Sequence, residues 1–311
     1  MSPTEPLSAF LARARVDIDE ALERYLPKPP ACPGIVSDAM RYSVFAGGKR
    51  LRPVLTLAAA EAVASSNDAA RLALPAACAI EMIHTYSLIH DDLPAMDNDT
   101  LRRGRPTLHV VHGDGIAILA GDGLHAEAFT LLAREPGDHG DPKLAERKLR
   151  VLQLVGEAAG PVGMVGGQAI DLQAAGQTPG PRITLDPDGL RAMHARKTGA
   201  LIRAAASAGA IMGGGDAAVV VAIDRYATEL GLAFQIVDDI LDVEGTAADL
   251  GKTAGKDAAE AKPTYPAFFG LERSRALATE CVGRANAALA SVDLAGSHLA
   301  AIADWVVTRK N

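Results

Sequence analysis

The sequence has little cysteine, no long uninterrupted apolar run and only a mild net charge. Its three cysteines, Cys32, Cys78 and Cys281, are odd in number and far apart, which argues against a disulfide framework and suits reduced thiols. Charged residues such as Glu61 and Asp224 interrupt the apolar stretches before any reaches the length of a membrane span. We therefore expect no stable membrane insertion.

Targeting signals and a strong charge bias are missing as well. The N-terminal segment lacks the long apolar core of a secretory signal, and the acids Asp17, Asp19 and Glu20 argue against a transit peptide. A net charge of −7 over 311 residues, with 22% charged and 49% apolar residues, is typical of a globular protein and excludes a general affinity for nucleic acid. We expect a cytoplasmic protein that binds any polyanion through a local cluster.

Apolar residues at three- and four-residue spacing are what the sequence has in abundance, and two-residue alternation is missing. We expect an all-α fold, a single large bundle of about ten or more helices in one domain over residues 1–311, because the loop-like stretches are too short to separate domains. The expected helices span residues 6–25, 34–46, 53–66, 71–92, 114–134, 143–160, 187–212, 216–244, 263–290 and 294–309.

Two acidic clusters end apolar helices. The first comprises Asp91, Asp92 and Asp97, and the second comprises Asp238, Asp239 and Asp242. Pro94 disfavours helical geometry at Leu93, so the first helix should end near Asp92 and Asp97 should lie in a loop. Carboxylates at a helix C-terminus oppose the macrodipole, and two of them about 5 Å apart repel by roughly 3 kcal/mol at an effective dielectric near 20.

A bound cation would relieve this repulsion. Oxygen ligands without cysteine or histidine favour Mg²⁺, which completes its coordination shell with water and substrate phosphate. Gln235, Asp238 and Asp242 fall at i, i+3 and i+7 and so share a helix face. A solvated acidic loop would explain either cluster alone, but two clusters that both end apolar helices favour a metal-bound phosphate.

Basic residues supply a second kind of phosphate site. The segment Phe45–Pro53, FAGGKRLRP, places Lys49, Arg50 and Arg52 on a turn into a helix, where backbone amides and fixed cations bind anions. A basic surface turn is the alternative, and neither a Walker loop nor a GxGxxG fingerprint is present. His84, two turns before the first aspartate, either assists this site or is simply packed in the core.

The triplet Lys197-Thr198-Gly199 interrupts another apolar helix. It indicates either a kink that exposes a backbone carbonyl or a mere packing irregularity. His109 and His112 lack a third partner and are discounted as a metal pair. One phosphate chemistry through metal and one through direct cations together predict two phosphorylated substrates.

These motifs resemble the polyprenyl (trans-isoprenyl) diphosphate synthases, and among them the bacterial enzymes that make farnesyl diphosphate. The matching segments are GGKRLRP at 47–53, SLIHDDLPAMDND at 87–99, RRGRPT at 102–107, KTG at 197–199, FQIVDDILD at 234–242, GKTAGKD at 251–257 and TYP at 264–266. The resemblance implies an isoprenoid synthase bundle around a central substrate cavity. It also implies a Mg²⁺-dependent head-to-tail (1'-4) prenyltransferase that condenses isopentenyl diphosphate with dimethylallyl and geranyl diphosphate.

The resemblance assigns roles residue by residue. The six aspartates of the two clusters would hold about three Mg²⁺ ions per active site on the allylic diphosphate. Direct contacts to that diphosphate are implied for Arg102, Lys197 and Lys252. Isopentenyl diphosphate would be held by Lys49, Arg52, His84 and Arg103, under a basic tail with Arg309 and Lys310. Thr198 and Gln235 would place oxygen dipoles near the developing allylic cation.

Product length is also implied by resemblance. Tyr86, five residues before the first aspartate, resembles the floor of the pocket in fifteen-carbon synthases, with Ser87 beside it. In an ideal helix Tyr86 points roughly 140° away from Asp91, so spacing alone would not select it. A geranylgeranyl diphosphate synthase and a non-catalytic prenyl diphosphate-binding subunit remain alternatives. The resemblance further implies a homodimer.

Overall fold

Helices account for nearly all of the regular structure in the part of the chain that the structure describes. This computed structural model describes residues 5–64, 68–137, 140–244 and 263–309. The helices are α1 (Leu7–Tyr25), α2 (Gly34–Val44), α3 (Leu51–Val63), α4 (Ala69–Asp91), α5 (Leu108–His112), α6 (Asp114–Arg134), α7 (Pro142–Ala159), α8 (Met164–Ala175), α9 (Pro187–His194), the π-helical turn η1 (Ala195–Gly199), α10 (Ala200–Gly213), α11 (Ala217–Glu244), α14 (Tyr265–Ala290) and α15 (His298–Thr308). The predicted all-α class is confirmed.

Three departures from the sequence-based expectation stand out. The segment 164–175 forms α8, although its two glycines weaken the helical pattern, and 108–112 forms the single-turn helix α5. Two short antiparallel strands, β1 (Leu101–Arg102) and β2 (Arg105–Pro106), form a hairpin that is too short to show alternation in the sequence. The expected helix over 187–212 is divided by η1, so the interruption at Lys197-Thr198-Gly199 is confirmed.

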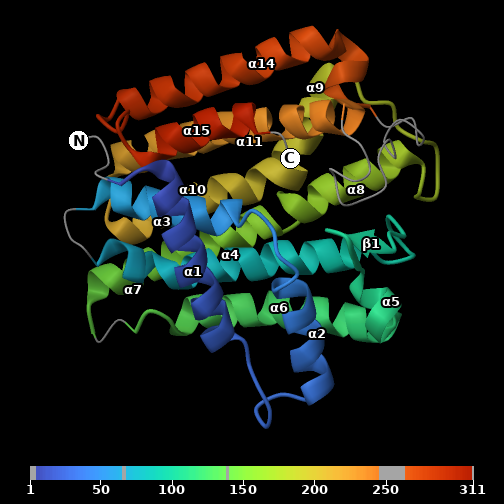
Figure 1. Cartoon of the computed structure of the whole chain (residues 1–311), viewed down its shortest axis with the longest axis horizontal. Coiled ribbons are helices and arrows are strands. Elements are labelled where there is room, and N and C mark those ends of the chain that lie inside the picture. The colour runs from blue at the N-terminus through green and yellow to red at the C-terminus, as the bar shows by residue number, and fades with distance from the viewer. Residues whose placement is uncertain (1–4, 65–67, 138–139, 245–262, 310–311) are drawn as a thin grey trace.

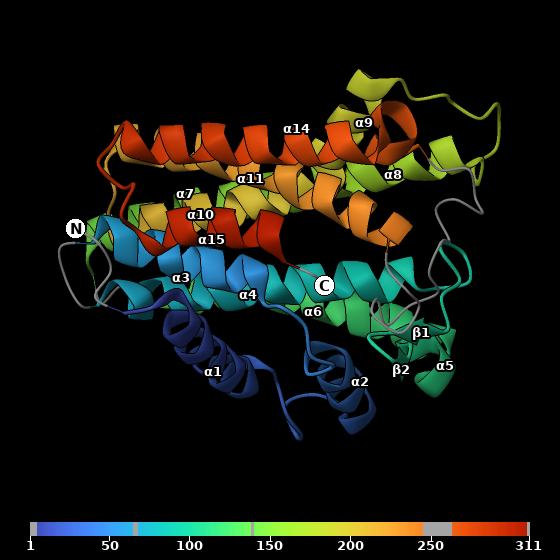
Figure 2. The same cartoon turned by 45° about the horizontal axis from the view of Figure 1, so that its top comes forward.

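The helices stack in layers, with α14 and α11 on one side of the bundle and α1 and α2 on the other (Figures 1 and 2). The central helix α10 packs against α3, α4, α7 and α11. Its Gly209 lies so close to α3 that a Cβ atom would come within 2.0 Å of the Thr56 carbonyl oxygen. The hairpin, α8 and α9 all lie toward the same end of the bundle.

One buried apolar cluster extends from Phe10 of α1 to Val306 of α15. Tyr226 of α11 is fully buried in it, and its hydroxyl donates a hydrogen bond to the Leu299 carbonyl of α15 at 2.7 Å. A buried tyrosine needs such a partner, and burial raises the pKa of its phenol. This bond fixes α15 on α11 and thereby positions the C-terminal residues near the second acidic cluster.

Two helices of the described chain, α4 and α6, are long and apolar enough to span a membrane. The apolar window of α4 is 78% buried by its neighbours, which identifies α4 as a core helix of the bundle. The window of α6 is 39% buried, and its Ile118 and Leu119 are exposed. The outer face of α6 is therefore unusually apolar.

Candidate active site

The first acidic cluster is assembled where the chain leaves α4 and turns back. The backbone N–H of Asp97 donates to the carbonyl of Asp91 at 2.8 Å, and that of Asp99 donates to the carbonyl of Asp92 at 3.2 Å. Asn98 adopts a left-handed conformation, with φ of 51°, that tightens the turn. Helix α4 ends at Asp91, as predicted, and the loop returns Asp97 to its end.

Asp92 is neutralised by the hairpin. Arg102 of β1 donates from Nη2 and Nε to its carboxylate, with a shortest distance of 2.6 Å, and Asp92 is only 4% exposed. Burial raises the pKa of Asp92, and the Arg102 guanidinium partly offsets that rise. In this structure Arg102 therefore contacts a carboxylate of the cluster and not the open cavity alone.

Asp91 pairs with no arginine in the part of the chain that the structure describes. Nε2 of Gln168, on α8, donates to its carboxylate. Burial, against the opposing charge of Lys197 and with repulsion from the nearby Asp97, raises the pKa of Asp91 to about 7. A carboxyl group that binds a proton near neutral pH is a site short of positive charge, which a metal ion can supply.

Lys197 lies in η1 and contacts α8. Its Nζ lies 2.5 Å from Oδ2 of Asp171. Burial lowers the pKa of Lys197, but Asp171 and Asp91 outweigh burial and raise it overall, so the side chain is a cation. Gly167 permits the contact, because a Cβ atom there would lie 2.2 Å from the backbone nitrogen of Lys197.

The next residue connects η1 to the second acidic cluster. Oγ1 of Thr198 donates to Oε1 of Gln235 at 3.2 Å, and Nε2 of Gln235 donates to Oδ1 of Asp239 at 3.0 Å. Asp239 also accepts from the backbone N–H of Tyr265 at 2.9 Å. The buried Asp239 carboxylate therefore faces the start of α14.

Asp238 faces the other way, toward an open cavity. Arg309 donates from Nη2 to Asp238 at 2.5 Å and to the carbonyl of Phe234 at 3.2 Å, and its guanidinium lies 4.1 Å from the Phe234 ring centroid. Nε and Nη1 of Arg309 are buried without a hydrogen-bond partner among the described residues. Asp242 lies one helical turn beyond Asp238 and is half-buried.

The cavity beside Asp238 has a volume of about 590 Å³ and a strongly basic wall. Its ionisable lining residues are Lys49, Arg50, Arg52, Glu81, His84, Arg102, Arg103 and Asp238. Residues predicted for two different substrates are thus brought to one cavity, with Thr198, Leu88 and Phe234 completing the wall.

Positive charge is in excess in this cavity. Burial, with repulsion from Arg309 and Arg103, lowers the pKa of Lys49 to about 8. Burial lowers the pKa of Arg52 as well, and its Nε has no partner among the described residues. Burial and the surrounding arginines hold the pKa of His84 well below its ordinary value, so its imidazole is neutral. These groups fit a polyanion.

Arg50 differs from its neighbours in the turn. It is 5% exposed and turns inward, where Nη1 donates to Glu81 at 2.8 Å and Nη2 to the Val44 carbonyl at 2.7 Å. Nε donates to Asp19 at 3.0 Å. Arg50 therefore joins α1, α2 and α4 and is a structural residue of this turn.

Arg103 extends to the glycine turn. Its Nη1 donates to the carbonyl of Gly47, and its guanidinium lies where a Cβ atom of Gly48 would be, about 2.6 Å away. Gly48 also has a φ of 129°, which L-residues rarely adopt. The glycine pair brings the hairpin cation to the same cavity as Lys49.

The two residues predicted at the pocket floor have different surroundings. Tyr86 is 8% exposed, and its ring lies 4.7 Å from that of His125 on α6 and edge-on to that of His90. Burial raises the pKa of Tyr86 to about 12. The hydroxyl of Ser87 donates to the His84 carbonyl at 2.8 Å within the same helix. Tyr86 therefore faces α6 and not the basic cavity.

Three residues near the clusters had no role in the sequence-based prediction. Gln168 and Asp171 stand at i and i+3 in α8 and so share a face of this helix. That spacing indicates a shared face only if the segment is helical, which the sequence pattern does not predict. Both ring nitrogens of buried His194 lack a partner among the described residues, and burial lowers its pKa to about 4. His194 lines a small cavity of about 100 Å³ with Asp171, Lys197 and Asp239. Lys252 and Lys310 lie outside the described residues.

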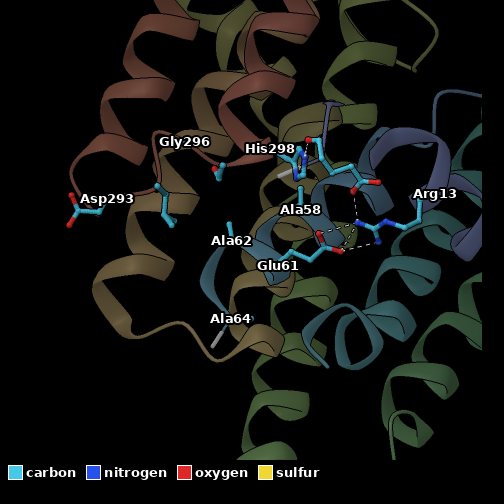
Figure 3. A pocket seen from close by; sticks show the side chains of 11 residues that line it. Arg13, Ala58, Glu61, Ala62, Ala64, Asp293, Gly296 and His298 are labelled. Carbon is cyan, nitrogen blue, oxygen red and sulfur yellow. Dashed lines mark hydrogen bonds and ion pairs between the residues drawn. The ribbon is translucent and has the colours of Figure 1, made fainter. Parts of the chain in front are cut away.

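A second large cavity, of about 560 Å³, shares no lining residue with the basic one (Figure 3). One arginine, Arg13, is among the described residues that line this cavity. It is already paired with Glu5 at 3.1 Å and with Glu61 at 3.2 Å. Its other charged groups include Asp293, so it does not present the excess cations found beside Lys49.

Residues 33–296 of the chain match the family described as polyprenyl synthetase. The chain is 44% identical to the farnesyl diphosphate synthase of Geobacillus stearothermophilus over 300 residues, which cover 96% of this chain and 97% of the relative. It is 42% identical to the geranylgeranyl diphosphate synthase of Cyanophora paradoxa, with coverage of 98% and 97%.

A solved structure shows the same arrangement of helices. The apo structure of an FPP/GFPP synthase from Zymomonas mobilis superposes with a TM-score of 0.82 at 40% identity, and the match covers 96% of this chain and 98% of that one. Both the sequence and the helical architecture are therefore shared over nearly the whole length.

Proposed function

Because the chain belongs to the polyprenyl synthetase family and is a prenyltransferase, we propose that its product is farnesyl diphosphate. The substrates are isopentenyl diphosphate with dimethylallyl diphosphate and then geranyl diphosphate, joined head to tail (1'-4). The observation that carries the proposal is the basic cavity, which Asp238 of the second acidic cluster lines together with Arg102, the partner of Asp92 in the first cluster. One part suits a diphosphate held by cations alone, and the other suits a diphosphate held through metal.

The residues fit Mg²⁺. The raised pKa of Asp91, about 7, marks a carboxyl group short of positive charge, and Asp97 is folded onto the same helix end. Among the described residues no three acidic, histidine or cysteine side chains form a ready-made metal cage. Mg²⁺ is usually held by one or two carboxylates with water and substrate phosphate, so a partial ligand set is what it requires.

We assign the metal ligands to the six aspartates of the two clusters, with about three Mg²⁺ ions per active site. When bound, Mg²⁺ neutralises the charge that develops on the departing diphosphate. Arg102 and Lys197 bind the same diphosphate directly, and Lys252, outside the described residues, is assigned with them. Asp238 faces the cavity. Asp239 would have to give up its hydrogen bond from the Tyr265 backbone N–H before that oxygen could bind a metal ion.

Isopentenyl diphosphate binds to the cations of the cavity without metal. Lys49, Arg52 and Arg103 supply charge, and neutral His84 supplies a ring N–H. Arg309, assigned with Lys310 to a covering tail, has two buried N–H groups that a phosphate oxygen would satisfy. An unsatisfied buried donor costs about 1–3 kcal/mol, so an incoming acceptor is favoured there.

The chemistry needs stabilisation of charge and exclusion of water. The allylic C–O bond breaks, diphosphate leaves, and the double bond of isopentenyl diphosphate forms the new C–C bond before a proton is lost. Thr198 and Gln235, which hydrogen-bond to each other, place their oxygens at the junction of η1 and α11 where the allylic carbon would lie. No described side chain is positioned as an obvious base, and we assign the proton to the released diphosphate.

Product length is the finer part of the proposal. Tyr86, buried against α6, supports a closed floor and a fifteen-carbon product. A geranylgeranyl diphosphate synthase is the second candidate, because relatives with that name are nearly as similar in sequence. A non-catalytic subunit is the third candidate. The presence of all six aspartates in the two acidic clusters argues against it, because such a subunit would be expected to lack some of them.

We also propose a cytoplasmic homodimer. The exposed Ile118 and Leu119 of α6, at 44% and 54%, support a partner on that face.

The test is incubation of the purified protein with isopentenyl and dimethylallyl diphosphates, with and without Mg²⁺, followed by chromatography of the dephosphorylated products. We expect a metal-dependent fifteen-carbon alcohol. A twenty-carbon alcohol would replace the farnesyl assignment by the geranylgeranyl one, and the absence of any condensation would leave the non-catalytic subunit.

A further inference from the structure

We propose that Asp171 is a positioning residue that holds Lys197 away from Asp91 and so keeps the first acidic cluster open for the metal-bound diphosphate. This inference rests on the proposed function and deepens it. It concerns α8, which carries none of the residues predicted from the sequence. Asp171 itself touches no substrate in this proposal and acts through Lys197.

The contact between α8 and η1 is fixed by backbone, not by flexible side chains. At Gly167 an added Cβ atom would lie 2.2 Å from the nitrogen and 2.6 Å from the Cα of Lys197. Asp171 stands one helical turn after Gly167, on the same side of α8. Its carboxylate contacts the end of the Lys197 side chain, with Oδ2 of Asp171 2.5 Å from Nζ of Lys197.

Lys197 lies between Asp171 and the first acidic cluster, whose Asp91 and Asp97 both attract it. Asp171 is in direct contact, while Asp91 attracts it from farther away, and Lys197 is the cation with the largest effect on the pKa of Asp91. Asp171 and Lys197 are only 17% and 26% exposed, so solvent screens their attraction little. The ammonium group is thus held on the Asp171 side of the site.

Helix α8 acts on Asp91 at the same time. Nε2 of Gln168 donates a hydrogen bond to the Asp91 carboxylate. Because the amide is uncharged, it does not neutralise the carboxylate. Without Asp171, the ammonium of Lys197 would have the carboxylates of the first acidic cluster, Asp91 foremost, as its remaining partners. An ammonium paired with Asp91 occupies the oxygens that a metal ion needs, so metal and lysine would compete.

The test is the Asp171→Asn variant, measured by calorimetric titration of inorganic diphosphate at a series of Mg²⁺ concentrations. We expect the Mg²⁺ concentration for half-maximal diphosphate binding to rise by about tenfold, which corresponds to about 1.4 kcal/mol. Binding of isopentenyl diphosphate in the absence of metal should stay unchanged, because its cations lie in the basic cavity. Asp171→Glu keeps the negative charge, so its Mg²⁺ concentration for half-maximal diphosphate binding should be close to that of the wild type.

Two further variants separate positioning from general damage. In the Lys197→Gln background the competing ammonium is gone, so adding Asp171→Asn should raise the Mg²⁺ requirement little beyond that of Lys197→Gln alone. Asp224→Asn is the matched control, because it breaks a remote ion pair with Arg203 at 2.8 Å and should change neither titration.

An unchanged Mg²⁺ requirement in Asp171→Asn, or an equal loss of metal-free isopentenyl diphosphate binding, would overturn the inference. Tighter diphosphate binding in that variant would also overturn it, since Asp171 would then merely repel the ligand. A wild-type protein that binds no diphosphate with Mg²⁺ would overturn the proposed function together with this inference.

Discussion

At the scale of single residues, two cations of the site are paired with carboxylates of the acidic clusters. Arg102 is bound to Asp92, and Arg309 is bound to Asp238. Each of these cations is also assigned to a substrate diphosphate, so substrate binding must exchange a protein carboxylate for a phosphate oxygen.

The pKa of Lys49, lowered to about 8, predicts a pH dependence. Because the pKa is lowered, the ammonium loses its proton at a lower pH than a free lysine, and the cation is present below pH 8 and lost above it. The KM for isopentenyl diphosphate should therefore rise by roughly fivefold between pH 8 and pH 9. Steady-state kinetics at a saturating allylic substrate would measure this rise.

Lys49→Arg is the control for that profile. An arginine stays charged throughout this range, so the KM of the variant should be nearly flat up to pH 9. The same slope in both proteins would assign the titration to another group.

Removing Tyr86 should lengthen the product. Tyr86→Ala opens space between α4 and α6 where the ring now contacts His125, so twenty-carbon or longer products should appear. Chromatography of the products measures the shift, with Tyr25→Ala on α1 as the matched control. A fifteen-carbon product from Tyr86→Ala would show that another residue forms the floor.

The carboxylates of the two clusters should be essential for turnover. Asp91→Ala or Asp238→Ala should lower kcat/KM by about 100-fold or more, since metal charge stabilisation contributes several kcal/mol. Asp99→Ala, in the same loop as Asp97, should have a small effect. Near-normal rates in the first two variants would make those carboxylates structural.

The sequence is sufficient to identify residues that occupy energetically unfavourable positions. Aspartates at helix ends break a local rule, which identifies Asp91, and the cation after a glycine pair identifies Lys49, whereas the role of Arg103 comes from the family resemblance alone. Arg50 was grouped with Lys49 because the turn does not reveal which side chain turns inward to Glu81. The roles of Gln168 and Asp171 depend on their partners, 77 and 26 positions away, which spacing cannot supply.

At the scale of the elements, the long amphipathic helices were predictable and the close approaches between them were not. The predicted interruption at Lys197 is the turn η1, but helix α8, against which it packs, was not expected at all. Glycines lower helix propensity in isolation, whereas the fold uses Gly167 to let two backbones touch. Tertiary packing outweighed the local preference.

That contact predicts a stability change. Gly167→Ala should lower the free energy of unfolding by about 1–3 kcal/mol, because the new methyl group overlaps the backbone of η1. Gly283→Ala is the matched control, since nothing lies within 4 Å of its Cβ position in α14 and the alanine should raise stability by about 0.4–1 kcal/mol. Urea denaturation compares the two, and equal changes would mean that α8 yields without cost.

At the scale of the whole molecule, the apolar outer face of α6 predicts self-association. Leu119→Asp should shift the protein toward a monomer, because a charge would be buried in the contact. Light scattering measures the mass, and Val16→Asp, on α1 and equally exposed at 56%, should leave it unchanged. A dimer that persists in Leu119→Asp would place the interface elsewhere.

Deletion of a single residue within the π-helical turn η1 would change the orientation of the helices on either side of it. A π-turn contains one residue more than an α-helical turn needs, so loss of a single codon at Ala195 would allow α9 and α10 to merge into a regular helix. Helix α9 and the segments before it would rotate by about 100° relative to α10. A gene with this deletion would retain each assigned residue, Lys197 and Thr198 included, and still encode an inactive protein.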